Sequence, residues 1–576
     1  MALRAAAAGF GELFTPKLVT ILREGYTLAD LKADAVAGLT VAIVALPLSM
    51  AIAIASGVTP DRGLYTAIVG GFVVSLLGGS RFQVGGPAGA FIVLVAATVE
   101  QQGLDGLILA TLLSGMLLLA VGLLRLGTFV KFVPYPVTVG FTGGIALIIF
   151  ASQLKELLGL TLDKEPGPLV PKLAALAAAA PSVNGAAVLV TALAVGAILL
   201  IRRVRPHWPA FIIAVGLASL AVWGFGIPVE TIGTRFGGIP QILPAPHLPH
   251  LSGQTVLAAL PAALSFALLG SIESLLSAVV ADSMTGRRHR SNCELVALGV
   301  ANIASALFGG FCATGLIART ATNVRAGARS PVAGMLHAVF LLLFMLAAAP
   351  LASYIPLSAL AAVLAIVAWN MVEKHGFATL LRASRGDAVV LLATFLLTIF
   401  RGLTEGILVG FGIGALLFLH RMAQAIEIDA ARPLIEEDEP DIRDGERRSP
   451  YDAALASNPD IIVYRISGAF FFGAAATVSA VLDRLAENPK AYVIDFSAVP
   501  FIDSTAATTI GGFVRKARRA EAGIFIAGAK PSVRRVLLTH GVRPPAARFR
   551  STVADAVAAA QMRSASAARA LLTAST

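Results

Sequence analysis

Charged residues are scarce in this chain: Asp, Glu, Lys and Arg make up 14% of its 576 residues, whereas hydrophobic residues make up 57%. A soluble protein of this length needs more polar residues to cover its surface. The net charge of +11 would suit a nucleic-acid-binding protein, but the basic residues stand in short clusters between long apolar runs. That distribution is typical of membrane proteins. The composition therefore predicts a multi-pass protein of the lipid bilayer and no nucleic-acid partner.

Cysteine is also rare, and the patterns of enzymes and metal proteins are missing. Cys293 and Cys312 form no C-x-x-C pair and have no metal-ligand spacing, so we expect two reduced packing residues. Residues 523–530, GIFIAGAK, miss a phosphate-binding loop because Ala529 separates the glycine from the lysine. The sequence contains no nucleophile elbow and no dinucleotide fingerprint. It predicts neither an enzyme nor a cofactor or metal.

Residues 36–424 form a series of apolar segments, for which we count about fourteen membrane crossings. Some are short and broken by Gly or Pro, as in transporters. The basic clusters between them follow even-numbered crossings. Because basic loops stay in the cytoplasm, this places both termini inside, including the N-terminal segment 1–35.

A second part follows the membrane region. Residues 425–459 form a charged linker without apolar periodicity. Residues 460–562 alternate strand-like and helix-like segments, with helices expected at 476–488 and after Asp503. We predict a small cytoplasmic α/β domain here, followed by a tail at 563–576.

One carboxylate stands inside an apolar run. Glu273 lies within Leu264–Gly286, which is long enough to cross a bilayer, since a membrane-spanning helix needs roughly 20 residues. An acidic side chain at that depth is costly and usually faces a water-filled cavity, where it meets an ion or a proton. Alternatively, the carboxylate is structural and is capped by Ser271 or Ser274. We interpret Glu273 as the mark of a transporter.

Two segments read as half-crossings that end inside the membrane. Residues 84–95, VGGPAGAFIVLV, and 312–324, CATGLIARTATNV, each have an extended Gly-rich approach and then a helix start, which we place at Pro87 and near Ile317. Helix N-termini carry partial positive charge, so two that meet at mid-membrane form an anion site. Arg319 adds a full charge and a planar fork that suits oxyanions, unless it only joins helices.

These half-crossings, the Glu273 helix, residues 57–71 (GVTPDRGLYTAIVGG) and residues 502–510 (IDSTAATTI) together resemble the SulP anion permeases, which carry a C-terminal STAS domain. The resemblance covers nearly the whole chain. It implies an α-helical polytopic membrane protein of two seven-helix inverted repeats, with core and gate domains and a cytoplasmic α/β STAS domain. It also implies a homodimer in the bacterial inner membrane that works by an elevator-type mechanism.

The resemblance also implies which residues face the substrate. From the first, third and tenth helices these are Leu46, Pro47, Leu48, Ser49, Pro87, Ala88, Gly89, Ala90, Ile317, Ala318 and Arg319. Glu273 and Ser277, four residues apart on one helix face, match the cation site of sodium-coupled members. Those members have a hydroxyl where this chain has Ile317, and the loss of an oxygen ligand weakens a Na⁺ site. We therefore expect Glu273 and Ser277 to couple transport to protons.

Leu48 after Pro47, together with the strings around Glu273 and Arg319, is most similar to the C4-dicarboxylate branch of the family. That implies proton-coupled uptake of succinate, fumarate or aspartate. One alternative is Na⁺-coupled bicarbonate or sulfate transport, and one of another class is an anion channel or a membrane-anchored STAS sensor. Ser504 resembles the phosphorylated serine of regulatory STAS proteins. We expect the STAS domain to have a cytoplasmic partner, which the sequence does not identify. Alternatively Asp503-Ser504 caps a helix, the reading that we favour.

Overall fold

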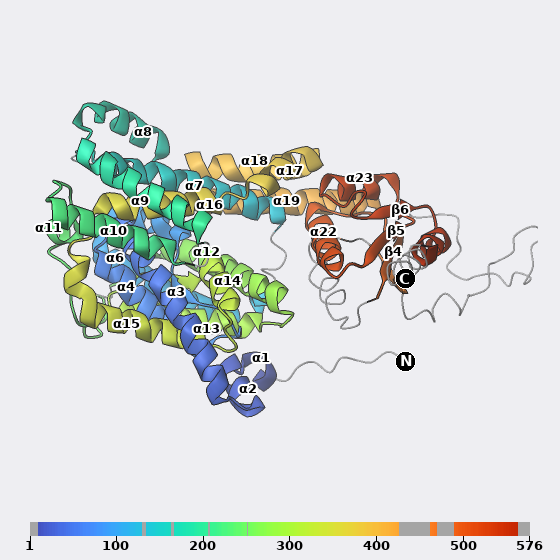
Figure 1. The fold of residues 1–576 in the computed structure, drawn as a ribbon, viewed down its shortest axis with the longest axis horizontal. Coiled ribbons are helices and arrows are strands. Elements are labelled where there is room, and N and C mark those ends of the chain that lie inside the picture. Colours follow the sequence, from blue (N-terminus) through green and yellow to red (C-terminus); the bar gives the residue numbers. More distant parts are fainter. Residues whose placement is uncertain are drawn as a thin grey trace, which may run out of the picture. The chain divides into compact units, whose positions relative to one another are not determined.

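The computed structural model describes residues 10–128, 134–162, 166–205, 208–249, 252–425, 461–468, 470 and 489–562 (Figure 1). The predicted linker after Ala425, the helix predicted at 476–488 and the tail at 563–576 lie outside these described residues. The chain divides into two compact units. The first comprises Met1–Lys131, Phe141–Glu373 and Phe395–Ile407; the second comprises Phe132–Gly140, Lys374–Thr394 and Leu408–Thr576.

Among the described residues, seven helices are long and apolar enough to cross a membrane. They are Leu28–Ala55 (α3), Gly89–Leu123 (α6 and the turn before it), Tyr135–Leu158 (α7), Gly185–Val204 (α9), Gly253–Thr285 (α12), Val332–Ala352 (α15) and Leu357–Ala383 (α16 and α17). Large apolar side chains such as Leu189 and Trp223 are 63% and 65% exposed. Such side chains suit contact with lipid rather than water.

The predicted count of about fourteen crossings includes shorter pieces. The helical part also contains helices that do not meet this length and hydropathy threshold. They are Pro60–Tyr65 (α4), Thr66–Gly70 (η1), Gly71–Leu77 (α5), Leu169–Ala178 (α8), Ala210–Phe225 (α10), Ser291–Leu307 (α13), Ile317–Arg325 (α14), Arg385–Phe400 (α18) and Leu403–Ala425 (α19). Helix α6 holds two segments, because Gly103 breaks its helical backbone at φ 69°. Further small helices of this part are Phe10–Phe14 (α1), Lys17–Glu24 (α2), Ala180–Ser182 (η4) and Ile232–Phe236 (α11).

The same order of elements occurs twice in the first unit. Helix α3, the broken helix α4–α5, strand β1 (Gly85–Pro87) and helix α6 correspond to α12, α13, strand β2 (Ala313–Gly315) and α14. The two strands pair antiparallel, with Gly85 opposite Gly315 and Pro87 opposite Ala313. An antiparallel pair is the arrangement that an inverted repeat produces. The pairing brings the two half-crossings together.

The predicted extended approaches are confirmed, but the prediction that Pro87 starts a helix is wrong. Pro87 is the last residue of β1, and the helical turn Gly89–Phe91 begins two residues later, followed by α6 from Ile92. Proline fixes φ near −65°, a value that an extended segment also accepts. In the other half-crossing α14 begins at Ile317, as predicted.

The second unit contains a parallel sheet in the order β3-β4-β5-β6. Its strands are Ile461–Ser467, Ala491–Ala498, Gly523–Ala527 and Arg548–Arg550, and its helices are α22 (Ser504–Arg519), α23 (Pro531–Thr539) and Val553–Met562. Apolar residues of α22 and α23 pack on one face of β4 and β5, and Ala556 and Val557 of the last helix pack on the other. Strands covered on both faces are mostly apolar, as β5 and all of β4 up to Asp495 are, and this made both strands predictable.

Close helix packing in the first unit depends on glycines. A Cβ added to Gly115 of α6 would lie 2.7 Å from the carbonyl oxygen of Gly299 in α13. A Cβ on Gly63 of α4 would overlap the carbonyl oxygen of Ser49 in α3. Small residues permit such close contacts between membrane helices.

We expect Gly63→Ala to destabilise the protein by about 1–3 kcal/mol, because backbone atoms of α3 cannot yield to the new methyl group. The matched control is Gly196→Ala in α9, where an added Cβ has no neighbour within 4 Å. Thermal unfolding in detergent should show a lower melting temperature for the first variant alone. Equal melting temperatures for the two variants would contradict the packing described here.

Candidate functional site

Arg319 lies in the first turn of α14, beside the β1–β2 pair. Its side chain is 2% exposed, and its Nη2 donates a hydrogen bond of 2.9 Å to Oγ of Ser49 in α3. Among the described residues, its Nε and Nη1 have no hydrogen-bond partner. Thus the structure brings together Ser49 and Arg319, two of the residues expected at the site, and leaves donors of the guanidinium available.

Strand β1 makes room for this guanidinium. A Cβ on Gly86 would lie 2.5 Å from Nη1 of Arg319, so a side chain at this position would displace the guanidinium from the strand. Gly86 also has φ 153°, which residues with a side chain rarely adopt.

In the described part of the chain, no carboxylate forms an ion pair with Arg319. A buried cation without a counter-ion is costly, because it loses hydration without gaining a partner. An anion that enters beside Nε and Nη1 would supply both charge and acceptors. The helix N-terminus at Ile317 adds backbone N–H groups that favour the same charge.

Helix α12 is joined to both half-crossings around Glu273. Three hydrogen bonds link them: Gln83 Nε2 to Ser274 Oγ at 2.6 Å, Ser277 Oγ to Thr320 Oγ1 at 2.9 Å, and Thr314 Oγ1 to the carbonyl oxygen of Gly270 at 3.0 Å. Ser277 therefore contacts the residue that follows Arg319. Glu273 and Arg319 are connected through this hydrogen bond and the backbone, not by a contact of their own.

Glu273 itself is 9% exposed, and among the described residues it has no hydrogen bond or ion pair. The buried Glu294 differs, because its Oε2 accepts a hydrogen bond of 2.9 Å from the Ser80 amide. Neither serine of the structural alternative caps Glu273: Ser271 donates to the carbonyl oxygen of Leu268, and Ser274 accepts from Gln83. Glu273 thus lacks the hydrogen-bond donor that Glu294 has, although both carboxyls are buried.

The other expected site residues differ in burial. Pro87, Ala88, Ala90 and Pro47 are buried, Leu46, Leu48 and Gly89 are half-buried, and Ile317 and Ala318 are exposed at the start of α14. The hydrogen-bonding residues Gln83, Ser274, Thr314 and Thr320 were not predicted. Their signal in the sequence was a polar residue within or beside an apolar segment, and Thr320 directly follows Arg319.

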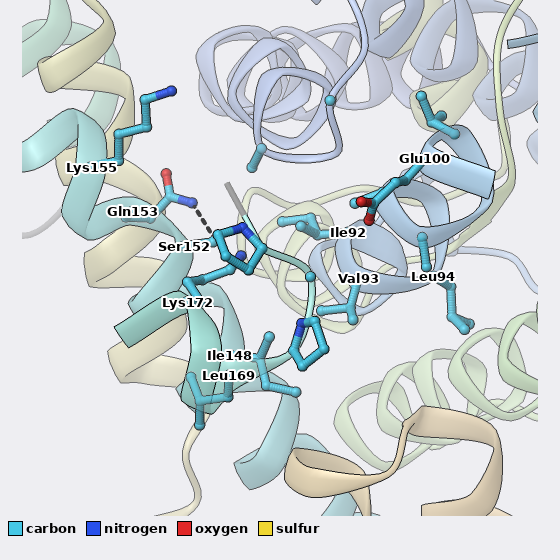
Figure 2. A pocket seen from close by; sticks show the side chains of 18 of the residues that line it. Ile92, Val93, Leu94, Glu100, Ile148, Ser152, Gln153, Lys155, Leu169 and Lys172 are labelled. Atoms are coloured by element: carbon cyan, nitrogen blue, oxygen red, sulfur yellow. Dashed lines mark hydrogen bonds between the residues drawn. The ribbon is translucent and has the colours of Figure 1, made fainter. Parts of the chain in front are cut away.

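A cavity of about 740 Å³ lies in the first unit (Figure 2). Ile92 and Val93 from the first turn of α6 line one side, and Ser152, Gln153 and Lys172 from α7 and α8 line the other. Neither Arg319 nor Glu273 lines it. The cavity therefore reaches the first turn of α6, and the buried arginine is not part of its wall.

Ser504 lies in the second unit, at the start of α22. Asp503 supplies the capping oxygen, which accepts a hydrogen bond of 2.8 Å from the Ala506 amide. The Ser504 hydroxyl is 1% exposed and donates to Oδ2 of Asp387 at 2.7 Å. Phosphorylation of Ser504 remains a prediction, and it would require this hydroxyl to leave its partner first.

Residues 31–394 match the model of the sulfate permease family, and residues 452–556 match that of the STAS domain. YvdB of Bacillus subtilis (strain 168), provisionally named a sulfate transporter, is 38% identical over 523 residues, which are 90% of this chain and 95% of YvdB. The solved transmembrane domain of a cyanobacterial bicarbonate transporter, BicA, is 31% identical to this chain and has a TM-score of 0.60. The match covers 67% of this chain and 98% of that chain.

The murine anion transporter Slc26a9, solved in an inward-facing state, shares the fold: its TM-score is 0.66 at 19% identity, with 97% of this chain and 96% of that chain covered. None of the comparisons supports a separate dicarboxylate branch. The family match spans the helical part that holds Arg319 and Glu273, and the STAS match includes the sheet of the second unit. The chain belongs to the sulfate permease family and carries a C-terminal STAS domain.

Proposed function

We propose that this protein is a secondary active transporter that carries a small divalent oxyanion together with a proton. The observation that supports it best is Arg319, which is buried beside two converging half-crossings with Nε and Nη1 unpartnered among the described residues. An Arg fork binds planar or tetrahedral oxyanions through paired hydrogen bonds.

Sulfate is our first candidate substrate, because YvdB, at 38% identity, carries the name of a sulfate transporter. The C4-dicarboxylates succinate, fumarate and aspartate, which the sequence pattern around Leu48 suggested, come second. Succinate, fumarate and sulfate carry two negative charges at neutral pH, so one arginine leaves part of that charge uncompensated. A proton bound in the same helical core would lower the charge that moves through the membrane.

Glu273 is the residue that we propose for this proton. Its carboxylate would be buried without a partner among the described residues, and protonation removes the cost of that charge. The bond between Ser277 and Thr320 ties its helix to the half-helix of Arg319. Anion and proton binding would then be linked, and each would favour the other. In an elevator-type cycle, the cavity beside Ile92 would admit the anion.

Na⁺-coupled bicarbonate transport is the second candidate, because a bicarbonate transporter has a solved domain at 31% identity. The start of α14 speaks against it: Ile317 is 37% exposed there and offers no oxygen to a cation. We further propose a homodimer in the bacterial inner membrane with cytoplasmic termini.

Two alternatives of another class differ in flux. A channel would show flux that no gradient of a second ion drives, and a STAS sensor would bind the anion without flux.

We expect Arg319→Gln to weaken sulfate binding by at least tenfold, because neutral amides replace a charged donor pair. Arg325→Gln, an exposed position in the last turn of the same helix, should retain the affinity of the unchanged protein. Binding of radiolabelled sulfate to the purified protein measures both. Full affinity in the Arg319 variant would remove its role in binding.

Glu273→Gln should abolish the response of uptake to an imposed pH gradient, because the amide cannot bind the proton. Exchange of labelled for unlabelled anion at equal pH on both sides of the liposome should continue, which shows that the variant is folded. Uptake by this variant that still follows the pH gradient would mean that another group carries the proton.

Replacing Na⁺ by choline in the uptake assay should leave the rate within about twofold, because Ile317 supplies no oxygen ligand for Na⁺ at the start of α14. Bicarbonate should compete poorly with labelled sulfate. Strict dependence on Na⁺, with bicarbonate as the preferred substrate, would favour the second candidate instead.

A further inference from the structure

A second pocket lies where several basic loops of the first unit meet. It has a volume of about 350 Å³ and is lined by Arg81, Arg287 and Arg329, together with residues of α2 and the start of α3. We call it the arginine pocket. The three arginines come from three different loops: before β1, after α12 and after α14. The volume is within the range of small-molecule sites.

Two of the three guanidinium groups are paired with acids. Arg81 Nη2 lies 2.7 Å from both carboxylate oxygens of Glu24, and Arg329 Nη1 lies 2.8 Å from Oδ1 of Asp30. The Arg81 guanidinium holds the pKa of Glu24 below its usual value, so this acid stays ionised. The Arg287 guanidinium has no ion pair or hydrogen bond within the described ranges. The pocket thus has a cation to spare.

The wall of the pocket is fixed by a third acid that does not enter it. Asp34 is fully buried and accepts hydrogen bonds from the Tyr26 hydroxyl at 2.9 Å, from the amides of Arg329 and Ser330 at 2.6 and 3.1 Å, and from the Ser330 hydroxyl. Its charge is therefore already matched by donors on its own side. The loop that carries Arg329 is held in place without a ligand.

We propose that the arginine pocket binds the phosphate group of an anionic phospholipid. Guanidinium groups from several loops suit phosphate oxygens, which accept bidentate hydrogen bonds. Leu22 follows the pocket-lining Ile21 in sequence, and Leu28 lies between the pocket-lining Tyr26 and Asp30; they are 58% and 70% exposed, so the same segment offers apolar surface for acyl chains. Basic segments at the edge of a membrane attract anionic lipids in the same way.

A lipid bound in the arginine pocket would contact loops that lead to both half-crossings. Arg81 precedes β1 by four residues, and Arg329 follows the end of α14 by four residues. A headgroup that contacts both arginines would bridge the ends of the two half-crossings. The bound lipid would then stabilise the arrangement in which β1 and β2 are paired, whichever anion the protein carries.

The test uses the purified full-length protein and native mass spectrometry, with dioleoyl phosphatidylglycerol and dioleoyl phosphatidylcholine as probes. Phosphatidylglycerol should be retained in preference, and Arg287→Gln should weaken its retention by about tenfold through the loss of a charged donor. The matched control is Arg288→Gln, because Arg288 is an exposed neighbour that does not line the pocket. A second variant, Glu24→Gln, should strengthen retention, because it releases Arg81 from its acid.

Equal retention of the two lipids, or equal retention of phosphatidylglycerol by the Arg287 and Arg288 variants, would overturn the proposal. A separate arm adds inorganic phosphate. If phosphate stabilises the protein against heat through Arg287 while phosphatidylglycerol does not, the pocket takes a soluble phosphate and the lipid assignment is wrong. If phosphatidylglycerol raises the melting temperature of the unchanged protein and of the Arg288 variant, but not of the Arg287 variant, the assignment stands.

Discussion

The arrangement depends on one constraint, a guanidinium that is buried where two half-crossings meet. Arg319 reaches this place because β1 and β2 pair antiparallel and because Gly86 leaves space against the strand. Ser49 accepts one of its donors, and α12 is held beside it through Thr320. A charge so placed needs a partner, and the described residues supply no carboxylate. A mobile anion from solution supplies that partner in the account proposed here.

Much of this site could be predicted from the sequence, because local rules act on it. Gly-rich approaches and a helix start near Ile317 follow from backbone preferences, and Glu273 stands out by hydropathy alone. The strand position of Pro87 could not be predicted in the same way, because proline fits the start of a helix and an extended segment equally well. The pairing of β1 with β2 decided between them.

Contacts between segments that are distant in the chain could not be predicted from the sequence. The hydrogen bond from Gln83 to Ser274 joins residues 191 positions apart, and a polar residue beside an apolar segment does not reveal its partner. The arginine pocket has the same origin, since its members read separately as the basic loops of a membrane protein. In the second unit, β4 and β5 were predictable as buried apolar strands, whereas Arg548–Arg550 is too short and too polar to be recognised as β6. Burial and pairing, not local preference, determine these features.

If the transported anion binds against Arg319, a structure determined with bound sulfate will show the contact. We predict sulfate within hydrogen-bond distance of Nε or Nη1 of Arg319, close to the first turn of α14. An ordered sulfate elsewhere in the core, with Nε and Nη1 of Arg319 still without an acceptor, would rule out anion binding at this arginine.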